Sequence, residues 1–183
     1  LILGAGPIGM LATFLLRADG VETTTVARQD QTSIKAELVE ACGGRYLNVR
    51  KTPLRDIKER YDFILEATGS ASVAFDAMHL IGTNGVLCLT SVTGGGTKKE
   101  IEVDKLNFEF VLGNKVILGI VNANRSHFVQ GFQDLERINA IWPNLLLRVI
   151  TRRAPASDFR RVLDRDPVQI KTTIRFSEIH QQA

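Results

Sequence analysis

Short apolar runs alternate along most of the chain with longer stretches in which apolar residues recur at helical spacing. The apolar runs predict strands over Leu1–Leu3, Glu22–Ala27, Arg45–Val49, Tyr61–Ala67, Gly85–Ser91 and Lys115–Val121. The stretches between them predict helices over Pro7–Asp19, Ser33–Cys42, Pro53–Arg60, Ala71–Ile81, Val103–Leu112 and His127–Ile141. Such alternation favours an α/β fold with a doubly wound, six-stranded parallel sheet of the Rossmann kind, covered by helices on both faces.

The pattern changes after Trp142-Pro143. The remaining chain is richer in Arg, and it predicts one short helix over Ser157–Asp166 and one strand over Gln169–Phe176. We therefore expect a dinucleotide-binding domain over residues 1–142 and a short α/β extension over residues 143–183. Because the chain opens inside a strand, we also expect that a preceding segment has been removed.

Composition narrows the class of protein without naming it. The chain has 183 residues, of which 44% are hydrophobic and 23% are charged, as in globular proteins. The net charge of +3 is not gathered into a basic run, so we expect no nucleic-acid partner. No apolar run is long enough to predict a membrane span. Cys42 and Cys88 stand in apolar stretches and are interpreted as buried thiols of a cytoplasmic protein.

The first turn carries the strongest chemical signal. Gly4-Ala5-Gly6-Pro7-Ile8-Gly9 has the GxGxxG spacing between an apolar strand and an apolar helix. Gly4 allows the tight turn, Gly6 lets a pyrophosphate approach the backbone, and Gly9 lets helix and sheet pack closely. Pro7 suits a first helical position, and the helix N-terminus presents free N–H groups to an anion. The alternatives are a turn that binds another nucleotide, such as SAM or FAD, or none.

The residue after the second strand predicts the choice of cofactor. A site for NAD usually carries Asp or Glu about 20 residues beyond the glycines, on the ribose 2′-hydroxyl. Here the position is Arg28, while Asp30 lies further on and is expected to point away. A guanidinium can bind a 2′-phosphate through charge-assisted hydrogen bonds, so NADP is favoured and NAD remains possible. The alternative is a solvated surface arginine.

Polar residues also follow the later strands. Ligands of doubly wound sheets bind outside the carboxyl ends of the strands. We expect Thr68 and Gly69 near the ribose and phosphates, and Ser91 and Asn122 near the nicotinamide or substrate. Each could instead be an ordinary turn residue. The full set of expected cofactor residues is Gly4, Gly6, Pro7, Ile8, Gly9, Arg28, Thr68, Gly69, Thr90, Ser91, Val121, Asn122 and Lys171.

Catalytic and metal-binding patterns are not recognisable. His79 lies inside a predicted helix, His180 lies in the tail, and His127 suits a surface or capping role at a helix start. No Cys/His cluster with zinc spacing is present, and no catalytic residue is assigned to this chain.

These residues resemble the cofactor-binding domain of the zinc-dependent medium-chain dehydrogenase/reductases, and most of all the archaeal-type glucose dehydrogenases. The general features are the glycine turn, Tyr61-Asp62 leading to Glu66-Ala67-Thr68-Gly69, and Asn84-Gly85-Val86-Leu87. The more specific ones are Asn114-Lys115, Gly119-Ile120-Val121-Asn122 and His127-Phe128. The resemblance continues through Arg152 to Ile170-Lys171 and so covers essentially the whole chain.

The resemblance implies oxidation of an aldose such as glucose at C1, with hydride passing to NADP+ or NAD+. It implies that zinc is held by a preceding catalytic domain, toward which the extension returns. It places the 2′-phosphate contact on Arg28, the nicotinamide and sugar contact on Asn122, and a phosphate contact on Lys171. It also implies a homo-oligomer that pairs along Lys115–Val121.

Two departures bear on specificity. Some members carry a substrate-contacting His where this chain has Leu112, and some carry Asn and a second Arg where it has Ala27 and Gln29. The departure at Leu112 bears on which sugar is the substrate. The departure at Ala27 and Gln29 bears on the preference for NADP over NAD. Two other functions stay open: a zinc alcohol or polyol dehydrogenase with a non-sugar substrate, and a non-catalytic domain that senses nucleotides.

Overall fold

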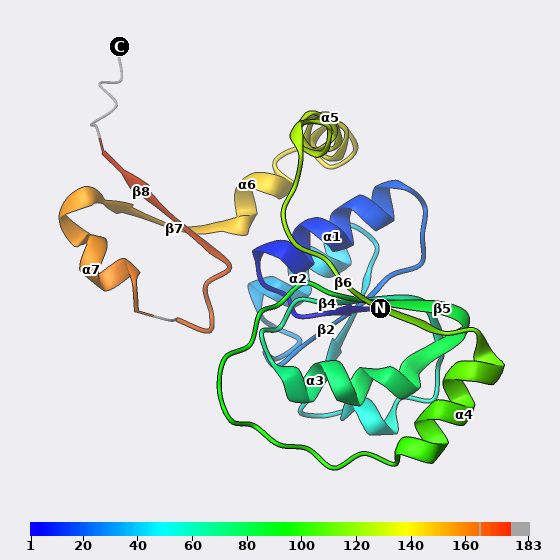
Figure 1. Ribbon diagram of the computed structural model, residues 1–183. Helices are drawn as coiled ribbons and strands as arrows, with labels where there is room; N and C mark the ends of the chain where they lie inside the picture. Colours follow the sequence, from blue (N-terminus) through cyan, green and yellow to red (C-terminus); the bar gives the residue numbers. More distant parts are fainter. Residues whose placement is uncertain (165, 177–183) are drawn as a thin grey trace, which may run out of the picture.

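A six-stranded parallel sheet forms the centre of the computed structural model, which describes residues 1–164 and 166–176 (Figure 1). The strand order is β3-β2-β1-β4-β5-β6, the doubly wound order of a Rossmann sheet, as the sequence predicts. Every pairing in this sheet is parallel, so all carboxyl ends meet at one edge. The strands are β1 (Ile2–Leu3), β2 (Thr24–Ala27), β3 (Arg45–Asn48), β4 (Tyr61–Glu66), β5 (Ile81–Leu89) and β6 (Val116–Gly119).

Helices cover both faces of the sheet (Figure 1). One face carries α1 (Pro7–Ala18), α2 (Ile34–Ala41) and α5 (Arg125–Ile141), which share a core built around Met10 and Phe14. The other face carries α3 (Ala71–Asp76), α4 (Val103–Gly113) and the 3-10 turns Leu54–Asp56 and Ala77–Leu80. Both Met10 and Phe14 are fully buried, as expected for the inward stripe of an amphipathic helix.

The segment between α3 and β5 differs from the prediction. The helix expected over Ala71–Ile81 ends at Asp76 and continues as a 3-10 turn, and β5 begins at Ile81. A Cβ atom at Gly85 would lie 2.9 Å from the carbonyl oxygen of Tyr61, so this glycine lets β5 pass close to β4. Gly82 and Gly85 therefore belong to a strand with an irregular register, and not to a helix stop.

The C-terminal extension has more structure than its sequence predicts. It contains α6 (Leu145–Val149), β7 (Ile150–Pro155), a 3-10 turn (Ala156–Asp158), α7 (Phe159–Val162) and β8 (Lys171–Arg175). The parallel pair β7-β8 forms a second sheet beside the Rossmann sheet (Figure 1). The strand β7 escaped prediction because its sequence, Ile-Thr-Arg-Arg-Ala-Pro, lacks an apolar run. The helix expected over Ser157–Asp166 is reduced to one turn before Leu163.

The extension shares its packing with the Rossmann part. Leu145 and Val149 of α6 are buried in the same core as Met10 and Phe14, and Ile170, just before β8, joins them. The loop between α7 and β8 is therefore anchored close to the sheet, on the side of α1 and α2.

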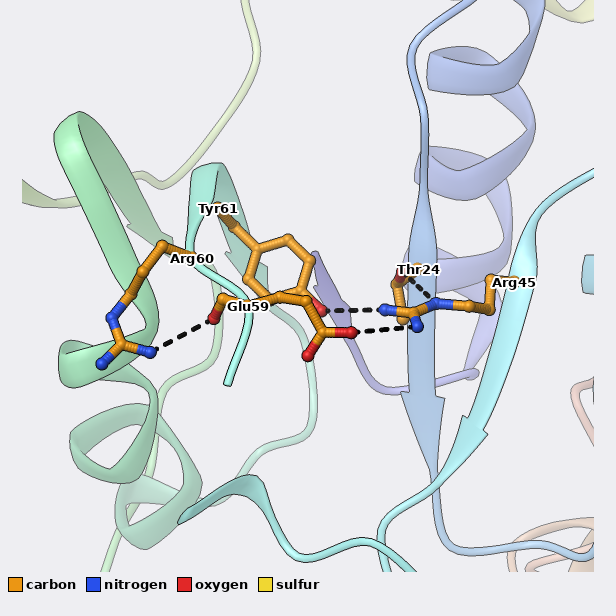
Figure 2. Close-up of polar contacts among 5 residues, drawn as sticks. All are labelled: Thr24, Arg45, Glu59, Arg60 and Tyr61. Carbon is orange, nitrogen blue, oxygen red and sulfur yellow. Dashed lines mark hydrogen bonds and ion pairs between the residues drawn. The ribbon is translucent and has the colours of Figure 1, made fainter. Parts of the chain in front are cut away.

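At the amino edge of the sheet, polar side chains from neighbouring strands and the segment before β4 bind one another (Figure 2). The guanidinium of Arg45 donates to the Oγ1 of Thr24 at 3.0 Å, to Glu59 at 3.1 Å and to the hydroxyl of Tyr61 at 3.3 Å. Arg60 donates to the carbonyl oxygen of Glu59 at 3.3 Å. These contacts tie β2, β3 and β4 together, so the polar groups at this edge bind one another.

Two further expectations concern the surface and the thiols. No helix in the described part of the chain is long and apolar enough to cross a membrane. Cys42 and Cys88 are buried and unpaired with each other, and burial raises the pKa of both thiols. They are packing residues in the reduced form.

A candidate dinucleotide site at the carboxyl edge

The glycine turn has the geometry that close approach of a pyrophosphate requires. Gly4 has a φ of +107°, and a Cβ there would lie 2.8 Å from the Ala67 carbonyl oxygen. A Cβ at Gly9 would lie 1.8 Å from the Gly4 carbonyl oxygen, so only glycine fits between helix and turn. Gly6 faces open space, because a Cβ at this position would meet no atom within 4 Å. The turn therefore packs tightly against the protein at Gly4 and Gly9 and leaves space for a ligand at Gly6.

The helix that follows this turn presents uncapped N–H groups. Gly6 is the N-cap of α1, it has no side chain to accept from the first turn, and Pro7 occupies the first helical position. Free N–H groups and the positive end of the helix dipole both favour an anion here. Ile8 is 58% exposed at the same turn, so an apolar surface borders this anion position.

Most of the other expected residues lie at the same edge. Arg28 follows β2, Thr68 and Gly69 follow β4, and Thr90 and Ser91 follow β5. Val121 and Asn122 follow β6 after one turn, where Asn122 adopts a positive φ of 67°. Lys171 is different, because it begins β8 in the second sheet. The parallel topology therefore brings residues from five strands together, while Lys171 belongs to the extension.

A buried carboxylate, Glu66, organises the loops after β4 and β5. Its Oε1 accepts from the backbone N–H of Thr68 at 2.7 Å and from the Thr68 hydroxyl at 2.5 Å. Its carbonyl oxygen accepts from the Thr90 hydroxyl at 2.6 Å. Glu66 is 2% exposed. Sequence reasoning noted it only as part of a family motif; the signal was a carboxylate at the end of a buried strand, which needs donors nearby.

These contacts decide which polar groups stay available. The Thr68 hydroxyl donates to Glu66 and accepts from the N–H of Ser70 at 3.1 Å, so it is largely occupied. The N–H of Gly69 donates to the Ser91 hydroxyl oxygen at 3.0 Å, and this leaves the Ser91 proton free for a ligand. Thr68 thus shapes the loop, whereas Ser91 both joins the two loops and faces the edge.

The side chains of Gln29 and Lys35 lie near Arg28 at the end of β2. Arg28 is exposed. The Nε2 of Gln29 donates to the carbonyl oxygen of Pro167 at 3.0 Å. Lys35 Nζ donates to the same oxygen at 2.7 Å. Burial, and next to it the charge of Arg28, lowers the pKa of Lys35, while Asp166 acts in the opposite direction.

Lys35 was not found from the sequence. Its only signal was a lysine in the first turn of the helix after β2, a place where lysines are common. Asp30 accepts from the Nδ2 of Asn48 at 3.2 Å, so this carboxylate lies toward β3, as its spacing suggested.

His127 has the capping role that the sequence suggested. The Oδ1 of Asn124 accepts from the N–H of His127 at 3.0 Å, and the His127 Nδ1 accepts from the N–H of Asn124 at 3.3 Å. This reciprocal capping box begins α5 directly after the Asn122 turn. His79 is exposed in the 3-10 turn after α3, and His180 lies outside the described residues.

A metal centre cannot be built from the described part of the chain. Over residues 1–164 and 166–176, no group of three or more His, Cys, Asp or Glu residues is placed to hold a metal ion. The polar groups that the structure gathers at the carboxyl edge are the glycine-turn backbone, the hydroxyls of Thr68, Thr90 and Ser91, the amide of Asn122, and the cations Arg28 and Lys35.

Together the sheet order, the glycine turn and the uncapped helix define a Rossmann domain of the dinucleotide-binding class. Residues 1–176 match the family model described as glucose dehydrogenase C-terminus, and the chain belongs to that family. It is 38% identical over 177 residues, 95% of this chain, to a glucose 1-dehydrogenase of Methanocella arvoryzae. It is 36% identical over 181 residues, 98% of this chain, to glucose 1-dehydrogenase 1 of Caldivirga maquilingensis. The chain spans about half the length of these relatives, 49% and 50%.

Solved structures agree with the fold and its family. The glucose dehydrogenase of Haloferax mediterranei, solved in complex with NADP, Zn and gluconolactone, superimposes with a TM-score of 0.86 at 29% identity. The match covers 97% of this chain and 50% of that one. The 2R,3R-butanediol dehydrogenase of Bacillus subtilis, at 17% identity, has a TM-score of 0.69 and shares the fold.

Proposed function

We propose that this chain binds NADP(H) and serves a zinc-dependent dehydrogenase that oxidises an aldose such as glucose at C1. The observation that carries the proposal is Arg28. It is an exposed cation at the end of β2, behind a dinucleotide turn, where a cofactor without the 2′-phosphate is usually met by an acid. Membership in the glucose dehydrogenase family and the NADP named with the Haloferax structure support it.

Each part of the edge has a task in this function. The glycine turn and the α1 N-terminus hold the pyrophosphate, with Gly4, Gly6, Pro7, Ile8 and Gly9 in contact. Arg28 binds the 2′-phosphate, and Thr68 and Gly69 shape the ribose side. Thr90, Ser91, Val121 and Asn122 line the nicotinamide side, where Asn122 also meets the sugar. Lys171 adds a positive charge toward the phosphates from β8.

The chemistry divides between this chain and the rest of the enzyme. The cofactor, when bound, would take up the hydride from C1 while the hydroxyl proton is released, and the residues of this chain would hold the nicotinamide ring in place and keep water out. Zinc, when bound, polarises the sugar hydroxyl. In line with the family resemblance, we assign the zinc ligands to a preceding catalytic domain; within residues 1–164 and 166–176 no group of three or more His, Cys, Asp or Glu residues is placed to hold a metal ion.

A second copy of the chain is proposed to pair along Lys115–Val121. In the described part of the chain β6 is an edge strand that pairs with β5 alone; Val116 and Leu118 on it and Ile120 just after it are 47%, 37% and 47% exposed. Exposed apolar edges of this kind usually pair with another chain. Replacing Leu118 by Lys should shift sedimentation toward the monomer while the far-ultraviolet circular dichroism spectrum stays unchanged.

The cofactor proposal is tested by titrating the chain with NADPH and with NADH while the nicotinamide fluorescence is followed. We expect NADPH to bind about tenfold or more tightly than NADH, since charge-assisted hydrogen bonds contribute about 1.5–3 kcal/mol. In Arg28→Ala the ratio of NADPH affinity to NADH affinity should fall, while the affinity for NADH stays unchanged. Equal affinities in the wild type would overturn the choice of NADP, and binding of neither would overturn the proposed function.

The substrate part needs the longer protein with its zinc. Oxidation of glucose should reduce NADP+ there, and an aldose panel compared with simple alcohols tests the substrate class. Turnover of alcohols without turnover of aldoses would favour the alcohol dehydrogenase alternative.

A further inference from the structure

We propose that Lys35 is a specificity-determining residue that supplies the second positive charge of the 2′-phosphate site, and that the Pro167 carbonyl positions it beside Arg28. This inference rests on the proposed function. Lys35 takes the place of the second arginine that some family members carry where this chain has Gln29.

The contacts around Pro167 fix the arrangement. Gln29 Nε2 and Lys35 Nζ donate to the same carbonyl oxygen, at 3.0 Å and 2.7 Å. Gln29 directly follows Arg28 in the chain, so the shared oxygen links Lys35 to the end of β2. Position 29, where some relatives have a cation, is thus turned toward the extension.

Burial makes the Lys35 ammonium unusual. Lys35 is 7% exposed, and a lysine this buried is normally paired with a carboxylate. Here its partner in the described structure is a neutral carbonyl, which satisfies one of its three donors. Over residues 1–164 and 166–176, no carboxylate lies within ion-pair distance of Lys35 or of Arg28.

The charges near Lys35 make an anion favourable there. Arg28 is close enough for its charge to disfavour the ammonium form of Lys35, and Asp166 offsets this repulsion only in part. The repulsion between the two cations is therefore only partly compensated, and a bound dianion would relieve the rest. A phosphate ester on the ribose 2′-oxygen carries about two negative charges at neutral pH and fits this requirement.

The test compares two variants at the shared carbonyl. Lys35→Met removes the charge and keeps an apolar stem, whereas Gln29→Leu removes the other donor to Pro167 without changing any charge. Lys35→Arg restores the charge. Each chain is titrated with NADPH and NADH, and adenosine 2′,5′-bisphosphate is compared with adenosine 5′-monophosphate as a probe of the adenosine end alone.

We expect Lys35→Met to lower the affinities for NADPH and for adenosine 2′,5′-bisphosphate by about fivefold or more. The affinities for NADH and for adenosine 5′-monophosphate should stay unchanged. Lys35→Arg should recover most of the loss, and Gln29→Leu should not reproduce it. Equal weakening of NADPH and NADH in Lys35→Met, the same selective loss in Gln29→Leu, or no effect at all would overturn the inference. If Arg28→Ala lowers the ratio of NADPH affinity to NADH affinity but Lys35→Met does not, the proposed function stands and this inference alone fails.

Discussion

The glycine turn, proposed to hold the pyrophosphate, and the end of β2, proposed to hold the adenosine 2′-phosphate, are built in opposite ways. The turn from Gly4 to Gly9 is local, and it works because side chains are missing where backbone and ligand must approach. At the end of β2, Gln29, which directly follows Arg28, and Lys35 both donate to the Pro167 carbonyl oxygen, and the Lys35 contact spans 132 residues of sequence. The turn should therefore control whether any dinucleotide binds, and the end of β2 should control which one binds.

The largest effect is expected at Gly9. In Gly9→Ala the new Cβ would lie 1.8 Å from the Gly4 carbonyl oxygen, so α1 must move away from the turn. Forcing atoms into a packed site costs about 1–3 kcal/mol or more, and we expect a lower Tm together with loss of both NADPH and NADH binding. Thermal unfolding and the two titrations measure this. A variant that keeps its Tm and both affinities would contradict the role given to the turn.

The matched control for that variant is Gly6→Ala. Its φ of −84° suits alanine, and no atom lies within 4 Å of the new Cβ. We expect an unchanged Tm and a similar loss for NADPH and NADH, about tenfold, because the methyl group occupies the pyrophosphate position. If Gly6→Ala lowered the affinity for NADPH and left the affinity for NADH unchanged, the 2′-phosphate would lie at the turn, and the two regions would not have separate tasks.

A smaller effect is expected at Glu66, which holds the loops after β4 and β5, on the other side of the glycine turn from the end of β2. In Glu66→Ala the N–H and hydroxyl of Thr68 lose their acceptor, and unsatisfied donors cost about 1–3 kcal/mol. Urea unfolding should show this loss, while Glu66→Gln keeps an acceptor oxygen and should lose less. If Glu66→Ala is as stable as the wild type, the carboxylate does not support the loop.

The smallest effect is a dependence of cofactor choice on pH. Because burial and Arg28 lower the pKa of Lys35, its ammonium should lose its proton in a milder alkaline range than a free lysine does. An anion favours the charged form, so the NADPH margin over NADH should narrow as pH rises from about 7 toward about 10. In Lys35→Arg the margin should stay constant, because a guanidinium keeps its proton throughout this range. Equal narrowing in both chains would point to another group.

Much of this molecule could be predicted because its signals are local. The alternation of apolar runs predicts all six strands of the Rossmann sheet, and the order of the sheet is confirmed. The capping role of His127 follows from its place three residues after Asn124. The strand β7 and the true start of β5 at Ile81 could not be read in this way, because their pairing partners, and not their own periodicity, make them strands.

The candidate site likewise combines residues that the sequence alone could place with residues that depend on tertiary contacts. The glycine turn and Arg28 are visible in the sequence, since their spacing from one strand end suffices to place them. Ser91 and Lys35 acquire their contacts only when distant segments meet, and Glu66 adds the Thr90 contact from the next strand to its local bonds with Thr68. By itself the sequence determined the class of fold and the anion-binding turn, through backbone constraints that act over a few residues. Only the tertiary structure decided that Gln29 faces the extension and that Lys35 stands near Arg28, because a carbonyl from the far end of the chain binds both side chains.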